Sequence, residues 1–163
     1  ASIVERNDQR EKIGASRASG QRSEGLIMLE NTNMGFINVI SVSSQYGTNY
    51  FLEYLVESPK LEEGQAAKKV KLVKRKSPPL WGKVTDIEWK GIDPLTQRLN
   101  FDYRLEDMLV PNSFKGSIEI IPEPKWQHTR IRTTYFLPAP DLFRAMDLIA
   151  KDIRLEYGYS KGR

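Results

Sequence analysis

The sequence predicts an α+β fold: an antiparallel sheet or half-open barrel of about seven or eight strands with one C-terminal amphipathic helix packed on it. Three observations predict this class. From residue 25 onward, short runs rich in β-branched and aromatic residues alternate with turn-forming residues. The hydrophobic period changes from two to the helical value only near the C-terminus. The 163 residues are enough for one domain with its own core.

Residues 1–24 contain few large apolar side chains, and Ser, Arg, Gly and Gln dominate after Lys12. Such a segment cannot bury enough surface to offset the entropy of ordering it. We therefore expect an N-terminal arm over 1–24, flexible or ordered by a partner, and a single α+β domain over 25–163.

The predicted strands are separated by turns rich in Gly, Pro, Asn and Ser, with a longer polar loop over 58–67. In order, they span 26–30, 36–44, 49–57, 69–75, 83–89, 97–105, 115–121 and 129–137. The clearest alternation lies in 97–105, which reads as a half-buried antiparallel strand. Its apolar positions are Leu99, Phe101, Tyr103 and Leu105, and its polar positions are Asn100, Asp102 and Arg104.

A helix is predicted after Pro140. Pro140 suits a first helical turn, Asp141 suits the N-terminal end of the helix dipole, and Gly158 is a plausible stop. Asp147 and Lys151 are spaced for an i,i+4 ion pair. The apolar stripe has helical spacing and consists of Leu142, Ala145, Met146, Ile149 and Ile153.

Composition excludes several kinds of chemistry within this chain. It has no cysteine, which excludes disulfides, thiolate metal sites and cysteine nucleophiles, and its one histidine excludes a multi-histidine metal site. No cofactor is expected. No run of apolar residues is long enough for a transmembrane helix. The chain begins at Ala1, which fits a processed precursor, so we expect an intracellular protein, with an organelle matrix or stroma as one location.

Positive charge is concentrated in one stretch. The net charge is +4, yet residues 68–90 alone contain eight basic and two acidic side chains, and six of the nine residues from Lys68 to Lys76 are basic. In a strand, Lys69, Lys71 and Arg75 would share one face, where they could contact an acidic protein, nucleic acid phosphates or an anionic membrane surface. The alternative is a solvated edge strand whose lysines prevent edge-to-edge pairing.

Tryptophans lie close to these cations in the sequence. Cations with stacking rings are typical of single-stranded nucleic-acid platforms. The segment 125–132 repeats the mixture, and it would form a composite patch with 83–90 if the two strands were adjacent. The candidate partner-binding or polyanion-binding residues are Lys68, Lys69, Lys71, Lys74, Arg75, Lys76, Trp81, Lys83, Trp89, Trp126, Arg130 and Arg132.

The other candidate catalytic or phosphate-binding residues have weak support in the sequence. His128 would need an orienting acid and a substrate pocket to act as a general base, and the sequence names neither. Asp102, Glu106 and Asp107 are interpreted as solvated carboxylates rather than a hydrolytic pair. The segment 14–20 lacks the spacing and the Lys-Ser/Thr of a phosphate loop.

The leading hypothesis is a non-catalytic accessory or structural subunit that docks into a larger macromolecular assembly through its arm and its basic strand. The alternative is an RNA- or single-stranded nucleic-acid-binding domain with a basic and aromatic sheet face. A further alternative is an enzyme or small-ligand carrier whose interior pocket is lined by Phe101, Tyr103 and Tyr135.

Overall fold

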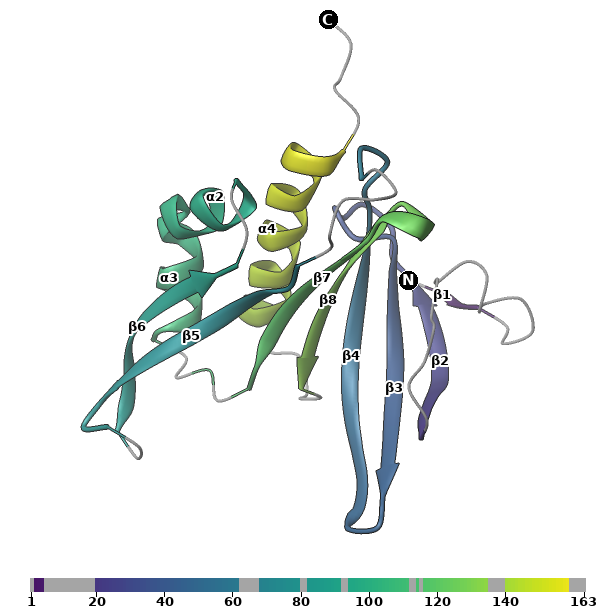
Figure 1. Cartoon of the computed structure of the whole chain (residues 1–163), viewed down its shortest axis with the longest axis horizontal. Coiled ribbons are helices and arrows are strands. Elements are labelled where there is room, and N and C mark those ends of the chain that lie inside the picture. The colour runs from purple at the N-terminus through teal and green to yellow at the C-terminus, as the bar shows by residue number, and fades with distance from the viewer. Residues whose placement is uncertain are drawn as a thin grey trace, which may run out of the picture.

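The predicted fold class is confirmed. A computed structural model describes residues 2–4, 20–61, 68–79, 82–91, 94–111, 114, 116–134 and 140–158. Within them, eight antiparallel strands form one sheet in the order β1-β2-β3-β4-β8-β7-β5-β6, and a C-terminal helix, α4, packs behind its centre (Figure 1). The strands are β1 (Ser2–Val4), β2 (Gln21–Met28), β3 (Phe36–Ser44), β4 (Gly47–Glu57), β5 (Val70–Ser77), β6 (Lys83–Lys90), β7 (Ile118–Glu123) and β8 (His128–Thr134).

Strands β1 to β4 form a meander at one end of the sheet. β3 has the bounds that the sequence predicts, and β2 begins at Gln21, inside the segment assigned to the arm. A bulge between Ser23 and Gly25 shifts the β2–β3 register. The backbone of β1 pairs with β2, and residues 5–19 of the predicted arm lie outside the described residues.

Strands β5 to β8 form the other half of the sheet, and their order along the sheet differs from their order in the chain. β8 returns to pair with β4, β7 pairs with β8, and β5 joins β7 through only two residue pairs, Val70↔Ile120 and Lys71↔Glu119. The β5–β6 hairpin therefore diverges from the rest of the sheet, as Figure 1 shows. Pro122 and Glu123, predicted as a turn, continue β7, and the 3-10 helix η2 (Pro124–Trp126) follows.

The prediction of a strand over 97–105 is wrong. The structure has two short helices there, α2 (Leu95–Phe101) and α3 (Tyr103–Leu109), which meet at Asp102. The Asp102 side chain caps α3 by accepting a hydrogen bond from the backbone N–H of Arg104. Leu99 and Leu105 are buried as predicted, but Phe101 and Tyr103 are exposed because they occupy the outer sides of the two helices.

Helix α4 (Pro140–Tyr157) confirms its predicted start, its buried stripe and its end before Gly158. The ion pair predicted between Asp147 and Lys151 is not formed. Asp147 accepts hydrogen bonds from the backbone N–H and side-chain amide of Asn33, at 2.7 and 3.0 Å, and no ion pair joins it to Lys151. The Asp147 carboxylate thus ties the β2–β3 loop to α4.

The two faces of the sheet differ. On the face that α4 covers, Leu52, Tyr54 and Val56 of β4 join Ile131 of β8 in a core that extends to α2 and α3. The opposite face, called the far face here, presents the alternate residues of the same strands, including Glu53 and Leu55. The described helices contact β4, β6 and β8 from the α4 side.

Candidate functional site

A network of charged side chains lies on the far face, in the middle of the sheet. Glu53 of β4 is only 1% exposed, and two arginines of β8 donate hydrogen bonds to its carboxylate. Arg130 reaches both oxygens through Nη1, at 3.2 and 3.3 Å. Arg132 reaches Oε1 through Nε and Nη2, at 3.0 and 2.6 Å. Burying a carboxylate this deeply is costly, and such charge-assisted hydrogen bonds offset part of that cost.

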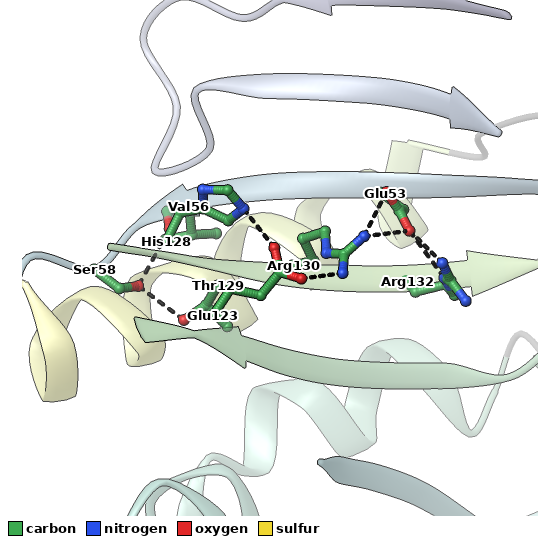
Figure 2. A network of polar contacts seen from close by, with 8 residues as sticks. All are labelled: Glu53, Val56, Ser58, Glu123, His128, Thr129, Arg130 and Arg132. Atoms are coloured by element: carbon green, nitrogen blue, oxygen red, sulfur yellow. Dashed lines mark hydrogen bonds and ion pairs between the residues drawn. The ribbon is translucent and has the colours of Figure 1, made fainter. Parts of the chain in front are cut away.

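The network continues toward the end of the sheet (Figure 2). Arg130 also donates to Oε1 of Glu123 on β7, and Oε2 of Glu123 lies 2.9 Å from Nε2 of His128. Two carboxylates and two guanidinium groups balance in formal charge within this network. Nearby, the Ser58 and Thr129 hydroxyls lie 2.8 Å apart and join the end of β4 to β8.

The network fixes strand register. Glu53 pairs with Arg132 across β4 and β8, and His128 pairs with Glu123 across β8 and β7. A shift of one residue would move each of these side chains to the opposite face. Only an indirect signal for this network is present in the sequence, because alternating charged residues in a strand are equally typical of a solvated face.

A pocket of about 330 Å³ adjoins the histidine end of the network. Gln127 has a left-handed backbone, with φ 51°, and this turn sets Trp126 and His128 at the same pocket. The pocket thus combines apolar walls with a carboxylate-oriented imidazole, which are the pocket and the orienting acid that the sequence could not name. Its lining is Gly35, Phe36, Leu55, Val56, Glu57, Pro59, Trp126, Gln127 and His128.

A second concave surface lies on the helices. A shallow groove of about 590 Å³ runs between α2, the start of α3 and α4. Phe101, 71% exposed, and Leu155, 56% exposed, line it together with charged side chains. Large apolar side chains gathered at a groove are typical of an interaction surface. The remaining lining residues are Pro94, Gln97, Arg98, Asp102, Arg104, Lys151 and Asp152.

Asp152 is the unusual member of this groove. It is only 5% exposed, and its Oδ2 atom is buried without a hydrogen-bond partner. Burial, and then the charge of Asp102, raise the pKa of Asp152 to about 6. The other two carboxylates nearby are engaged, since Asp102 pairs with Arg104 and Glu156 with Arg98. The side-chain hydrogen bond from Arg104 is the main cause that lowers the pKa of Asp102.

The basic strand β5 has the two faces that the sequence predicts, but its cations face acids. Lys69 and Lys71 lie 3.8 and 3.3 Å from Glu119, and Arg75 lies 3.7 Å from both Asp86 and Glu88. Lys68, Lys76 and Lys83 are exposed. The positive charge of β5 is therefore interleaved with negative charge from β6 and β7, which reduces its field.

Three predicted site residues are buried or engaged by other groups of the fold. Trp89 is 2% exposed and Arg130 is held by Glu53 and Glu123, so neither can meet a base or a phosphate. Lys74 lies on the inner face of β5, where its ammonium donates to the carbonyls of Phe114 and Gly116. Burial, and then the charge of Lys76, lower the pKa of Lys74.

The composite basic and aromatic patch does not form. β6 and the β7–β8 turn are far apart in the strand order, with β5 and β7 between β6 and β8. Trp126 lies at the pocket, and Arg132 belongs to the buried network. Trp81 lies outside the described residues, as does Tyr135 of the predicted interior pocket. The other two aromatics of that pocket, Phe101 and Tyr103, are on the surface.

Two absences apply to the described part of the chain. It contains no group of three His, Asp or Glu side chains placed to hold a metal ion. Its helices include none with the length and apolar composition needed to cross a bilayer.

Comparison with known protein families, with curated proteins and with solved structures found no match to this chain.

Proposed function

We propose that this protein is a non-catalytic docking subunit that binds a partner protein in the groove between α2, α3 and α4. One observation carries the proposal: Phe101 and Leu155 are exposed beside a buried carboxylate, Asp152, whose Oδ2 has no hydrogen-bond partner. Exposed apolar groups around a buried unpaired acceptor are costly for an isolated surface, and both costs fall when a partner covers them.

The chemistry of the groove supports a proposal for the class of partner. The apolar side chains favour an apolar segment, and the Asp152 carboxyl group that lines the groove favours a cation beside it, so the proposed occupant is an apolar protein segment that carries an arginine or lysine side chain. Its cation would lie against the ring of Phe101 and hydrogen-bond to Asp152, as cations do on aromatic faces. Arg98 and Arg104 compete little for Asp152, because each already pairs with another carboxylate.

The proposed docking surface therefore lies on the helices rather than on the basic strand. The sequence-based hypothesis of docking through the arm and β5 stays a prediction. The nucleic-acid alternative also stays a prediction, and it now depends on exposed cations that face Glu119, Asp86 and Glu88.

The test compares two surface variants in a gentle lysate. Leu155→Ser removes an apolar wall of the groove, and Tyr46→Ser is the matched control, since Tyr46 is a large side chain, 91% exposed, on the distant β3–β4 hairpin. A photoreactive residue placed at 155 or at 46 identifies what touches each site. Truncation of a central interface residue weakens binding by about tenfold or more.

We expect a fixed companion to co-elute with the wild type and the control, to be lost with Leu155→Ser, and to crosslink at 155 through a segment with an arginine or lysine. Three results would contradict the proposal: crosslinks only to this chain, loss of the complex on nuclease treatment, or equal binding by both variants. The second of these would favour the nucleic-acid alternative.

A further inference from the structure

The pocket beside His128 supports an inference that is independent of docking at the helices. It lies at the end of the sheet where β4 stops and β7 turns into β8, and its volume of about 330 Å³ is at the small end of ligand-binding cavities. Phe36, Leu55, Pro59 and Trp126 supply its apolar walls. Lys125 places its ammonium 5.2 Å from the centre of the Trp126 ring, which helps to hold that ring in place.

The orientation of the imidazole is set by the network behind it. An ionised carboxylate can only accept a hydrogen bond, so the contact of Glu123 with Nε2 requires the proton on Nε2. Arg130 holds Glu123 in turn. In the neutral ring, Nδ1 is then an acceptor.

The second ring nitrogen is available. Figure 2 shows it pointing away from Glu123. Among the described residues, Nδ1 has no hydrogen-bond partner. The charged side chain in the lining, Glu57, forms no ion pair with another described residue and is also an acceptor. Nδ1 of His128 and the Glu57 carboxylate therefore both favour a ligand that donates a hydrogen bond.

We propose that this pocket binds a small aromatic molecule carrying one O–H or N–H donor. The ring packs against Trp126, Phe36 and Leu55, and the donor hydrogen-bonds to Nδ1 of His128. The volume suits a molecule of one aromatic ring with small substituents. A site built to bond a donor discriminates strongly against an analogue that lacks it, because the buried acceptor is then left unpaired.

The experiment uses two probes of similar shape. p-Cresol has the donor, and 4-methylanisole replaces its O–H with O–CH3. His128 is the one histidine of the chain, so its imidazole signals in an NMR spectrum report on a single site. At a pH of about 8 the ordinary imidazole is neutral. We expect p-cresol to shift these signals saturably and 4-methylanisole to bind at least about tenfold more weakly.

Two variants and a control complete the test. His128→Gln keeps an N–H donor for Glu123 and replaces the Nδ1 acceptor with an amide oxygen in a different position, so it should reduce the preference for p-cresol, measured on the Trp126 indole N–H signal. Trp126→Ala should weaken p-cresol binding by about fivefold or more. Tyr46→Ala, on the distant β3–β4 hairpin, should change nothing. Equal binding of both probes to the wild type, no saturable binding, or unchanged preference in His128→Gln would overturn the proposal.

Discussion

At the scale of single residues, the most consequential side chain is Glu53. Its carboxylate is the shared acceptor of Arg130 and Arg132 at the centre of the sheet, and it is almost fully buried. A buried ion pair of this kind adds little compared with apolar packing, but removing one partner leaves the other charge buried and uncompensated. The network is therefore expected to matter more for which structure forms than for how stable it is.

Glu53→Gln should lower the free energy of unfolding by about 3 kcal/mol, because Arg130 and Arg132 lose their shared negative charge. Urea unfolding followed by circular dichroism measures the change. The matched control is Glu88→Gln on β6, whose exposed pairs with Arg75 and Lys90 should contribute less than about 1 kcal/mol. Similar losses in the two variants would show that the far-face network is not effectively buried.

Asp152 gives stability a pH dependence of definite sign. Burial raises its folded pKa from 3.8 to about 6, so the folded chain holds the proton over a range where the unfolded chain has lost it. Its contribution is therefore most favourable below pH about 4, declines as the pH rises through about 6, and stays low above that.

Asp152→Asn should remove this decline and raise the free energy of unfolding by about 2 kcal/mol at pH 8, with a smaller gain at pH 5. Urea unfolding at the two pH values measures both gains. Asp107→Asn, an exposed carboxylate on α3, should have little effect at either pH. A gain for Asp152→Asn that is the same at both pH values would contradict the assignment of the titration to Asp152.

At the scale of elements, α2 and α3 show why one prediction failed. Leu95 and Leu99 are spaced by four residues, as are Leu105 and Leu109, and all four are buried, which is the pattern of two helices. The break at Asp102 separates Leu99 from Leu105 by six positions. Apolar residues then fall on alternate positions across the break, which is the pattern of a strand. These residues are Leu99, Phe101, Tyr103 and Leu105.

The other elements were predictable for physical reasons. α4 carries a long, regular apolar stripe between two end signals, and β3 and β4 are rich in residues that favour strands. The sites were not predictable to the same degree. The charged network depends on β8 returning beside β4, and strand order cannot be read from local pattern.

An element-scale prediction concerns the edge strand β6. The side chain of Asn100 on α2 accepts from the backbone N–H of Trp89 at 2.7 Å and donates to its carbonyl at 3.0 Å, as a neighbouring strand would. Asn100→Ala should lower the free energy of unfolding by about 1–2 kcal/mol, because both backbone groups lose their partner. Amide hydrogen exchange at Trp89 should accelerate.

Gln97→Ala, an exposed position on the same helix, is the control and should leave the exchange of Trp89 unchanged. If Asn100→Ala leaves that exchange rate as it is, the α2 side chain does not protect the edge of the sheet.

At the scale of the whole molecule, one core connects both halves. Buried side chains from β4 to β8, the helices α2 and α3, and α4 form a single apolar cluster. The diverging β5–β6 hairpin is attached to it through Trp89 and through α2 and α3. The groove lies on the helical surface of this cluster, and the pocket at the end of the far face shares Val56 with it, so the other lining residues can be altered with little effect on the cluster.

The N-terminal limit of the folded unit gives the whole-molecule prediction. The predicted domain starts at residue 25, yet β2 begins at Gln21. Two of the four residues from Gln21 to Glu24 are half-buried and bond to buried residues of β3. The Ser23 hydroxyl donates to Oδ1 of Asn38 at 2.7 Å, and Glu24 accepts from the Ser41 hydroxyl. Asn38 is fully buried, so its amide oxygen has no access to water as a replacement.

A chain that begins at Gly25 should therefore be less stable than one that begins at Gly20, by about 2 kcal/mol or more, because it lacks these two hydrogen bonds and the β2–β3 pairs of Gln21, Arg22 and Ser23. Urea unfolding of the two truncated chains, beside the full chain, measures this difference. Equal stability would place the boundary at residue 25, as the sequence predicts. The expected loss would instead place residues 21–24 within the fold, since their partners on β3 depend on them.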